Sequence, residues 1–398
     1  MEASTIPATC PMSTGPDHRK SARLAREGGT IDPDVRTQTF GRSRAVLRSA
    51  HTRQDGFLAE QVGRIGKPMR QPILYLEGEA HRVQRSATAR FFTPRVVTTR
   101  YRDLMIRLSD GLVDGFRKRK RARLDDLSLE LAVAVAGDIV GLNTDNIKGL
   151  AKRLDAFLTG SFEKSPSKFA AIAKILNSQI RVFAFYYRDV VPAIRARKKA
   201  RQDDVISHLI DEGYTGREIL TECLVYGAAG MATTREFIVM AAWHMLERDE
   251  LRTAFLSADE GGKIALLEEL LRLEPVVGYI FRRMKADLPG DGDDGAIGAG
   301  SAVAIDVRAA NSDESAFGGC PHKAEPGRKV SAKYGNAGLS FGDGEHRCPG
   351  AQVALYETSL FLERLLATPG LKLERAPDIA WNRLVTGYEL RNAVITCD

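Results

Sequence analysis

One cysteine of this chain lies in a loop punctuated by glycines, and such a loop can hold a metal ion. The loop runs Leu339-Ser340-Phe341-Gly342-Asp343-Gly344-Glu345-His346-Arg347-Cys348-Pro349-Gly350. Gly342 and Gly344 permit left-handed turns and a close approach of the backbone. A helical pattern follows at 351–366, and the dipole at its N-terminus would point toward the sulfur of Cys348, which favours a thiolate. The pattern therefore predicts a cysteine that ligates a metal.

A long helix is expected upstream of this loop. Thr215 and Glu218 have the spacing of a capping box, and an apolar helical pattern continues over 219–246. Its middle, 226–234, is rich in small residues, and each interior glycine costs a helix about 1 kcal/mol relative to alanine. The small residues predict the close approach of something flat, and tight packing against another helix is the alternative.

Two pairs of charged or basic residues have helical spacing. His81 and Arg85 lie at i, i+4, and Glu269 and Arg272 lie at i, i+3 just before a proline that ends their helix. Taken alone, each pair would be an ordinary surface pair. Arginine is suited to bidentate contact with a carboxylate, and histidine can add a second donor.

The run Phe-Gly-x-Gly-x-His-x-Cys-x-Gly, from Phe341 to Gly350, resembles the haem-ligating signature of the cytochrome P450 family. These haem-thiolate monooxygenases are the usual illustration of thiolate ligation of haem iron. The resemblance extends over nearly the whole chain, from about Val35 to Glu389. It implies haem b (iron protoporphyrin IX) as the cofactor and Cys348 as the metal ligand. It also implies a set of cofactor-binding residues: Cys348, Phe341, Gly342 and Gly350 in the loop, and His81, Arg85, Arg283 and His346 at the haem propionates, with Arg282 as a competitor one position away.

The small-residue stretch of the long helix is similar to the oxygen-activating segment of that family, Ala/Gly-Gly-x-Asp/Glu-Thr. This chain reads Ala229-Gly230-Met231-Ala232-Thr233, so Thr233, Gly230 and Ala229 are the implied catalytic residues. A hydroxyl at Thr233 can bond to the carbonyl one turn back and hold a hydrogen-bond chain for proton delivery. A helix-packing threonine is the alternative. Ala232 stands where the family usually has an acid, so a proton must come from water or another group such as Glu236, and we expect leakage of hydrogen peroxide.

The Glu269–Arg272 pair also matches the family, in which a later arginine joins it in a buried network. That arginine would be Arg328, in the turn Glu325-Pro326-Gly327-Arg328, although Ala324 replaces the phenylalanine that usually precedes this turn. Breaking such a network from one side would be costly.

Composition permits one large domain. The 398 residues are 43% hydrophobic and 27% charged, enough to bury a sizeable core. We expect a loose N-terminal tail at 1–20 and one haem-thiolate monooxygenase domain at 21–398. Its fold class would be mainly α (α+β), a cytochrome P450 fold that is a helix-rich single domain with small β-sheets. The five scattered cysteines predict no disulfide framework. The longest uncharged apolar stretch, 223–234, is too short for a bilayer, so a cytoplasmic protein without membrane contact is expected.

The implied partners are O2, an apolar small molecule, and a separate ferredoxin with its ferredoxin reductase. The expected reaction is hydroxylation or oxidative coupling in secondary metabolism. Net charge is +7, with basic runs at 117–123 and 195–201, which are either solvated helix ends or a docking face for an acidic electron donor. The expected pocket walls are 56–75, 156–173, 224–234, 276–280 and 385–388.

Three other classes of protein stay open. A peroxide-using haem enzyme would usually lack the helix threonine, so Thr233 counts against that reading. A non-catalytic haem-binding sensor would bind haem without substrate-dependent electron uptake. A basic nucleic-acid-binding protein is the least favoured, because no aromatic interleaving or known binding module accompanies the charge.

Overall fold

The computed structural model describes residues 19–22, 24, 33–56, 69–142, 145–160, 168–290, 295–318, 320–325, 327–328, 330–331, 334–383 and 385–398. Most of the expected tail, 1–20, and parts of two expected pocket walls, 56–75 and 156–173, lie outside these residues.

The first half of the chain is mostly helical. Its α-helices are α2 (Phe40–Arg48), α4 (Gly78–Ala89), α5 (Pro94–Val96), α6 (Arg102–Arg119), α7 (Leu124–Val140), α8 (Ile147–Gly160), α9 (Lys168–Phe185), α10 (Val191–Lys199) and α11 (Val205–Asp211). Shorter 3-10 or π segments are η1 (Ile73–Tyr75), η2 (Arg90–Phe92), η3 (Val97–Tyr101) and η4 (Tyr186–Val190).

The second half adds the long helix and most of the strands. Its helical segments are α12 (Gly216–Tyr226), η5 (Gly227–Ala232), α13 (Thr233–Glu247), α14 (Asp249–Ser257), α15 (Glu260–Leu273), α16 (Val307–Ala310), α17 (Glu314–Phe317), η6 (Gly344–His346) and α18 (Ala351–Leu366). The strands of the chain are β1 (Val35–Thr37), β2 (Thr52–Asp55), β3 (Arg121–Arg123), β4 (Tyr279–Met284), β5 (Ala302–Asp306), β6 (Lys372–Arg375), β7 (Asp378–Asn382), β8 (Gly387–Arg391) and β9 (Val394–Thr396).

The expected long helix is confirmed, and it contains a π-helical turn. Helices α12 and α13 are joined through η5 without a break, so helical structure runs over 216–247. The capping box is present, because the Thr215 side chain accepts from the backbone N–H of Glu218 while Glu218 accepts from the N–H of Thr215. The π turn coincides with the glycines of the small-residue stretch, where helical bonding is weakest.

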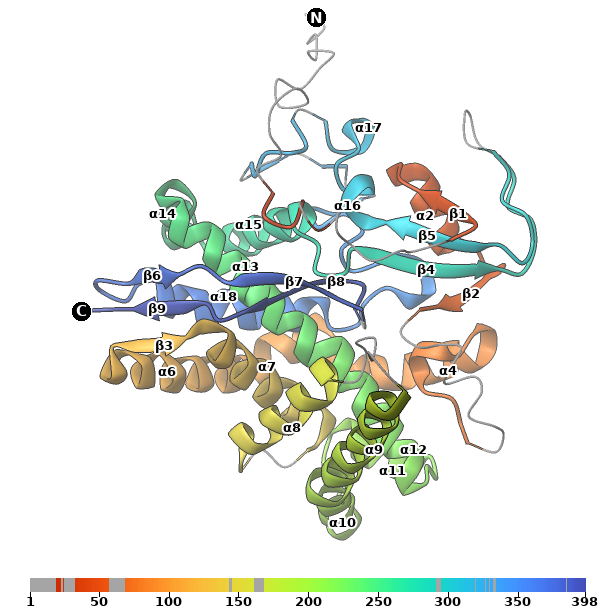
Figure 1. The fold of residues 1–398 in the computed structure, drawn as a ribbon, viewed down its shortest axis with the longest axis horizontal. Helices are drawn as coiled ribbons and strands as arrows, with labels where there is room; N and C mark the ends of the chain where they lie inside the picture. Colours follow the sequence, from red (N-terminus) through yellow and green to blue (C-terminus); the bar gives the residue numbers. More distant parts are fainter. Residues whose placement is uncertain are drawn as a thin grey trace, which may run out of the picture.

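Two hydrophobic cores stabilise the domain. The larger core is built around α7 and α13, whose side chains are buried on nearly all sides, and both helices pack against α18. The smaller core lies between α2 and the sheet that contains β4 and β5. In Figure 1, α13 crosses the middle of the molecule, with α6, α7 and α8 on one side and the β4/β5 sheet on the other.

The strands form three small sheets, as expected for this fold class. The largest has the order β1-β5-β4-β2, in which β1 and β5 are parallel and the other pairs are antiparallel. The others have the orders β3-β9-β6 and β7-β8. The sequence prediction missed β3, which lies inside the basic run at 117–123 and pairs with β9.

Free thiols are found at Cys223, Cys348 and Cys397, whereas Cys320 is disulfide-bonded, contrary to the expectation of unpaired cysteines. Across the described part of the chain, no helix combines the length and apolar character that crossing a bilayer would require.

Candidate active site

The cysteine loop is folded tightly against the N-terminal part of the domain. Gly342 and Gly344 have φ values of 68° and 70°, which favour glycine. A Cβ atom on Gly344 would lie 2.4 Å from the carbonyl oxygen of Leu47 in α2. The same contact region holds two ion pairs, because Asp343 accepts from Arg44 at 2.6 Å and from Arg48 at 2.8 Å. Helix α2 therefore fixes the position of the loop.

The thiol of Cys348 is partly exposed and is surrounded by donors. The backbone N–H of Cys348 donates to the carbonyl of Phe341 at 2.8 Å, and the N–H of Gly350, at the start of α18, is bonded to the sulfur. Burial raises the pKa of the thiol, and the Gly350 N–H and the guanidinium groups of Arg85 and Arg347 act in the opposite direction. A metal ion at the sulfur would add the positive charge that a thiolate needs here.

Open space lies beside the middle of the long helix, and we refer to it as the hollow. Ala229 is exposed although the residues of α13 that follow are almost all buried, and a Cβ atom on Gly230 would meet nothing within 4 Å. The hydroxyl of Thr233 donates to the carbonyl of Ala229 at 2.6 Å, as the sequence predicted, and Thr234 makes the same bond to Gly230 at 2.7 Å. Open space beside small residues is what a flat ligand would require.

A group of basic side chains lies next to the cysteine loop. The rings of His81 and His346 lie with centroids 4.2 Å apart, and Arg85 donates to the carbonyl of Arg347. Burial and the nearby Arg282 lower the pKa of His346 to about 3. The Nδ1 atom of His81 is buried and has no hydrogen-bond partner among the described residues. The ring of His81 therefore has an unsatisfied nitrogen at this site.

The structure places Arg282, not Arg283, in this group. Neighbouring residues of a strand point to opposite faces, and Arg282 of β4 is 4% exposed and close enough to lower the pKa of both histidines. Burial lowers the pKa of Arg282 itself to about 10, and no ion pair to it is found within the described residues. Arg283 instead forms an ion pair with Asp55 at 2.9 Å and donates to the carbonyl of Gly300. Arg282, the competitor one position away, is therefore better placed than Arg283 for the role expected at the propionates.

The structure brings the remaining loop residues together with the cysteine. Phe341 packs at the edge of the larger core and accepts the hydrogen bond from Cys348, and a Cβ atom on Gly342 would lie 3.9 Å from the Ile280 side chain of β4. Gly350 is the N-cap of α18 and has open space where a Cβ would stand. Arg85 interacts electrostatically with both the Cys348 thiol and Tyr226 of α12, so it lies between the loop and the long helix.

The predicted buried network exists as well. Arg272, fully buried, binds Glu269 through two hydrogen bonds of 2.7 and 2.9 Å, and Arg328 joins the same carboxylate at 3.0 Å. Both arginines also donate to backbone carbonyls, including those of Asn311 and Cys320. The network fastens the turns that lead to the cysteine loop onto α15.

Sequence reasoning missed a second pair of carboxylates that fastens an expected pocket wall. Glu218 and Glu222 share one face of α12 and accept from the backbone N–H groups of Arg70 at 2.9 Å and Ile73 at 3.0 Å. The guanidinium of Arg70 also lies 4.6 Å from the ring of Tyr214. The i, i+4 spacing was the only signal in the sequence, and it does not say what the carboxylates bind.

The residues present fit a haem group. Within the described residues no set of three or more His, Cys, Asp or Glu side chains could hold a metal ion, so a metal at Cys348 would take its other ligands from a cofactor. The hollow beside Ala229 and Gly230 suits a flat molecule. The unpartnered Nδ1 of His81 and the unpaired, buried guanidinium of Arg282 suit two carboxylates.

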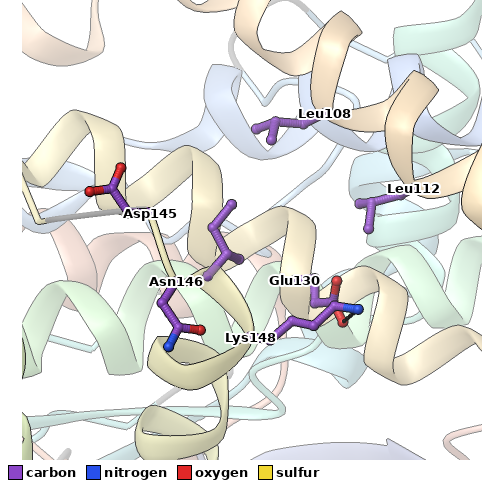
Figure 2. A pocket seen from close by; sticks show the side chains of 7 residues that line it. Leu108, Leu112, Glu130, Asp145, Asn146 and Lys148 are labelled. Atoms are coloured by element: carbon purple, nitrogen blue, oxygen red, sulfur yellow. Dashed lines mark ion pairs between the residues drawn. The ribbon is translucent and has the colours of Figure 1, made fainter.

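A cleft of about 300 Å³ lies elsewhere, between α6, α7 and the start of α8, and contains none of the predicted site residues. In Figure 2, Glu130 and Lys148 approach one another across the cleft, and Leu108 and Leu112 form its apolar side. The nearest nitrogen and oxygen atoms of Glu130 and Lys148 are 4.0 Å apart. This is an open surface feature rather than the enclosed site that the cysteine loop indicates.

The fold and the cysteine loop define a haem-thiolate protein. Residues 264–378 match the sequence model of the cytochrome P450 family. Steroid C26-monooxygenase of Mycolicibacterium smegmatis is 28% identical over 76% of this chain and 73% of its own length. Cytochrome P450(BM-1) of Priestia megaterium is 26% identical over 73% of this chain and 69% of its own length.

Solved structures have the same fold. That of CalO2 covers 97% of this chain and 94% of its own, with a TM-score of 0.77 and 19% identity. That of P450BioI, in complex with an acyl carrier protein ligated to hexadec-9Z-enoic acid, covers 91% and 92%, with a TM-score of 0.74 and 24% identity. In the sequence of residues 264–378 and in its overall fold, the chain is similar to the cytochrome P450 family of haem-dependent monooxygenases.

Proposed function

We propose that this protein oxidises an apolar organic small molecule with O2, by hydroxylation or oxidative coupling, with Cys348 as the axial ligand of haem b. When bound, thiolate-ligated haem supplies the activation of O2 by electrons from a donor protein. Three observations carry the proposal: the Cys348 thiol, the unpartnered Nδ1 of His81 in the group next to its loop, and the open space at Gly230 of the long helix. Arg85 lies between the loop and that helix. A haem would satisfy all three at once.

Four basic side chains would hold the two propionates. His81, Arg85, Arg282 and His346 come from α4, β4 and η6, and the guanidinium groups of Arg85 and Arg282 form no ion pair within the described residues. A propionate there would raise the depressed pKa of His346 and remove the repulsion between the guanidinium groups. Cofactor binding and the folding of these elements would thus be coupled.

Thr233 would hold the proton chain in the hollow. Its hydroxyl is anchored on the carbonyl of Ala229, so its oxygen can still accept a hydrogen bond from water or a ligand. The alternative donor, Glu236, is 2% exposed and already accepts from Arg235, Arg391 and the N–H of Leu390. With Ala232 in place of the family's acid, water is the remaining source of protons in this proposal.

The substrate would be apolar. Two expected wall segments lie side by side, because the carbonyl of Thr386 accepts from the N–H groups of Gly278 and Tyr279 at 3.0 and 3.1 Å. Relatives are named for steroids, nocardicin C and biotin biosynthesis, and P450BioI was solved with an acyl carrier protein. The proposal therefore includes apolar substrates that are free and those that are attached to a carrier protein.

Electrons would come from a ferredoxin and its reductase. The donor must approach the cysteine loop, where Arg347 and Pro349 are exposed. The basic run at 117–123 is a weaker candidate for this face, because Arg121 and Arg123 are paired with Glu374 and Asp125. These ion pairs support the interpretation of the run at 117–123 as a helix end and a sheet edge.

The test is the spectrum of the reduced, carbon-monoxide-bound protein. Thiolate ligation gives a strongly red-shifted Soret band, and Cys348→Ala and Cys348→His should abolish it. Cys397→Ser, at a partly exposed free thiol outside the loop, is the matched control and should retain the band. Holoprotein without iron, or a band that persists in both Cys348 variants, would show that the proposal is wrong. Haem binding without substrate-dependent electron uptake would favour a sensor.

A further inference from the structure

Four large apolar side chains lie exposed on one face of α9 and η4. Leu176, Ile180, Phe183 and Tyr187 are 57–63% exposed, and among the described residues only Val83 of α4 is a comparable case. Their spacing of four, three and four places them in one row along the helix. We name this row the α9 stripe. Phe183 and Tyr187 are stacked, with centroids 6.3 Å apart and planes 9° apart, so they present one flat apolar surface.

Unpaired positive charge adjoins the end of the α9 stripe. Helix α9 continues through η4 into α10 without a break. The cations that are exposed there, and that form no ion pair within the described residues, are Arg188, Arg195, Lys198 and Lys199. Arg197 and Arg201 are already paired, with Asp204 and Asp211. We name the four unpaired residues the α10 cations.

This combination is unusual for a surface that faces only water. A contiguous apolar patch on a protein surface commonly marks a place where another molecule binds. Unpaired cations beside it add long-range attraction for an anionic partner. The helical run holds both sets on one rigid element, so the surface is already formed before any partner arrives.

The arrangement favours a protein over a membrane. A helix that lies in a lipid interface has cations along the flanks of its apolar face. Here, among the described side chains, Asn177 and Gln179 beside the stripe are neutral, the guanidinium of Arg181 is partly buried and donates to the carbonyl of Ala156, and the exposed cations are collected at one end. A second copy of this chain would bring the same positive charge and would not neutralise it. A small acidic protein with an apolar patch would match both halves of the surface.

We propose that the α9 stripe and the α10 cations dock an acidic carrier protein that presents the substrate to this enzyme. The inference rests on the proposed function, to which it adds a partner. In Figure 1, α9 and α10 lie at the lower edge of the molecule, and α4, whose Arg85 contacts the cysteine loop, lies on the right. The carrier and the electron donor would therefore use different surfaces and could bind together.

The test measures binding of a holo acyl carrier protein to the haem-loaded full chain, by calorimetry or interferometry. We expect binding that weakens as salt rises. Ile180→Ser with Phe183→Ser, and Arg195→Glu with Lys198→Glu, should each weaken it by about tenfold or more. The matched control is Lys118→Glu with Arg119→Glu, exposed cations at the end of α6, and it should bind as the unmodified protein does.

Several results would overturn the docking inference. These are no binding of the carrier protein, binding that neither stripe variant changes, self-association that the stripe variants abolish, or stripe-dependent binding to phosphatidylglycerol vesicles in its place. The carbon-monoxide spectrum of each preparation separates the two ideas. If the red-shifted band is present and the carrier does not bind, only the docking inference fails. If the band is absent, the proposed function fails whatever the carrier does.

Discussion

Glu222 offers a quantitative test of how the pocket wall is fastened. This side chain of α12 is 2% exposed, and its Oε1 accepts from the N–H of Ile73 at 3.0 Å. Its Oε2 is buried and has no hydrogen-bond partner among the described residues. Burial raises the pKa of Glu222 from 4.5 to about 7, which the Ile73 N–H opposes only in part. The ionised form is therefore the less stable form in the folded protein.

The direction and the size of the change in folding stability with pH follow from the linkage between proton binding and folding. Because the pKa is higher in the folded state, the unfolded chain loses its proton first, and folded stability falls as pH rises from about 4.5 to about 7. At about 1.4 kcal/mol for each pKa unit, the full loss is about 3 kcal/mol. Most of this, about 2 to 3 kcal/mol, falls between about pH 5 and pH 8. The Glu222→Gln variant keeps an oxygen for the Ile73 N–H and cannot ionise.

The assay is urea unfolding of the haem-loaded protein followed by circular dichroism at the two ends of that range. We expect Glu222→Gln to gain about 2 to 3 kcal/mol over the unmodified protein on going from about pH 5 to pH 8. Glu218→Gln is the matched control one turn away. Burial raises the pKa of Glu218, but hydrogen bonds from Arg70 and Thr215 lower it by more, so its substitution should cost stability at the higher pH. A constant difference between Glu222→Gln and the unmodified protein would refute the reasoning.

Three further predictions concern the cofactor site and the buried network. Arg282→Leu should lower haem retention during gel filtration and Arg283→Leu should not. If only Arg283→Leu lowers haem retention, Arg283 is the arginine at the propionates. Thr233→Ala should raise the hydrogen peroxide formed per NAD(P)H consumed, whereas Ala232→Asp should lower it; tight coupling in the unmodified protein would contradict both. Arg328→Ala should destabilise the protein by about 2 to 4 kcal/mol in urea unfolding, because it removes one of the two arginines that bind Glu269 and the donor to the carbonyls of Cys320 and Lys323, and a loss below about 1 kcal/mol would contradict that account.

The sequence was most informative where a pattern is local. The Thr215–Glu218 box marked the start of the long helix correctly, because capping is decided within one turn. The bond from Thr233 to Ala229 was foreseen for the same reason. The identity of the propionate arginine was not decided locally. It depends on which face of β4 is turned inward, and that is fixed by pairing with β2 and β5.

Other features depend on contacts between distant segments, so no local sequence pattern could predict them. Strand β3 is formed by three residues, 121–123, of a basic run and exists only because β9 pairs with it. The partner of Glu222 is a backbone N–H about 150 positions earlier in the chain. The exposure of the α9 stripe likewise depends on which helices leave that face uncovered. Its apolar residues were read in the sequence as part of an amphipathic helix.

The contact between α2 and the cysteine loop bears on the order in which this enzyme assembles. Arg48 and Asp343 are 295 positions apart, and a growing chain would have completed α2 long before it produced the loop. The turn at Gly344 has room only for a hydrogen in place of a side chain, against Leu47. The loop around Cys348 would therefore reach its final conformation late in folding, after it has come into contact with α2. A porphyrin that arrived before that contact formed would find an incomplete binding site.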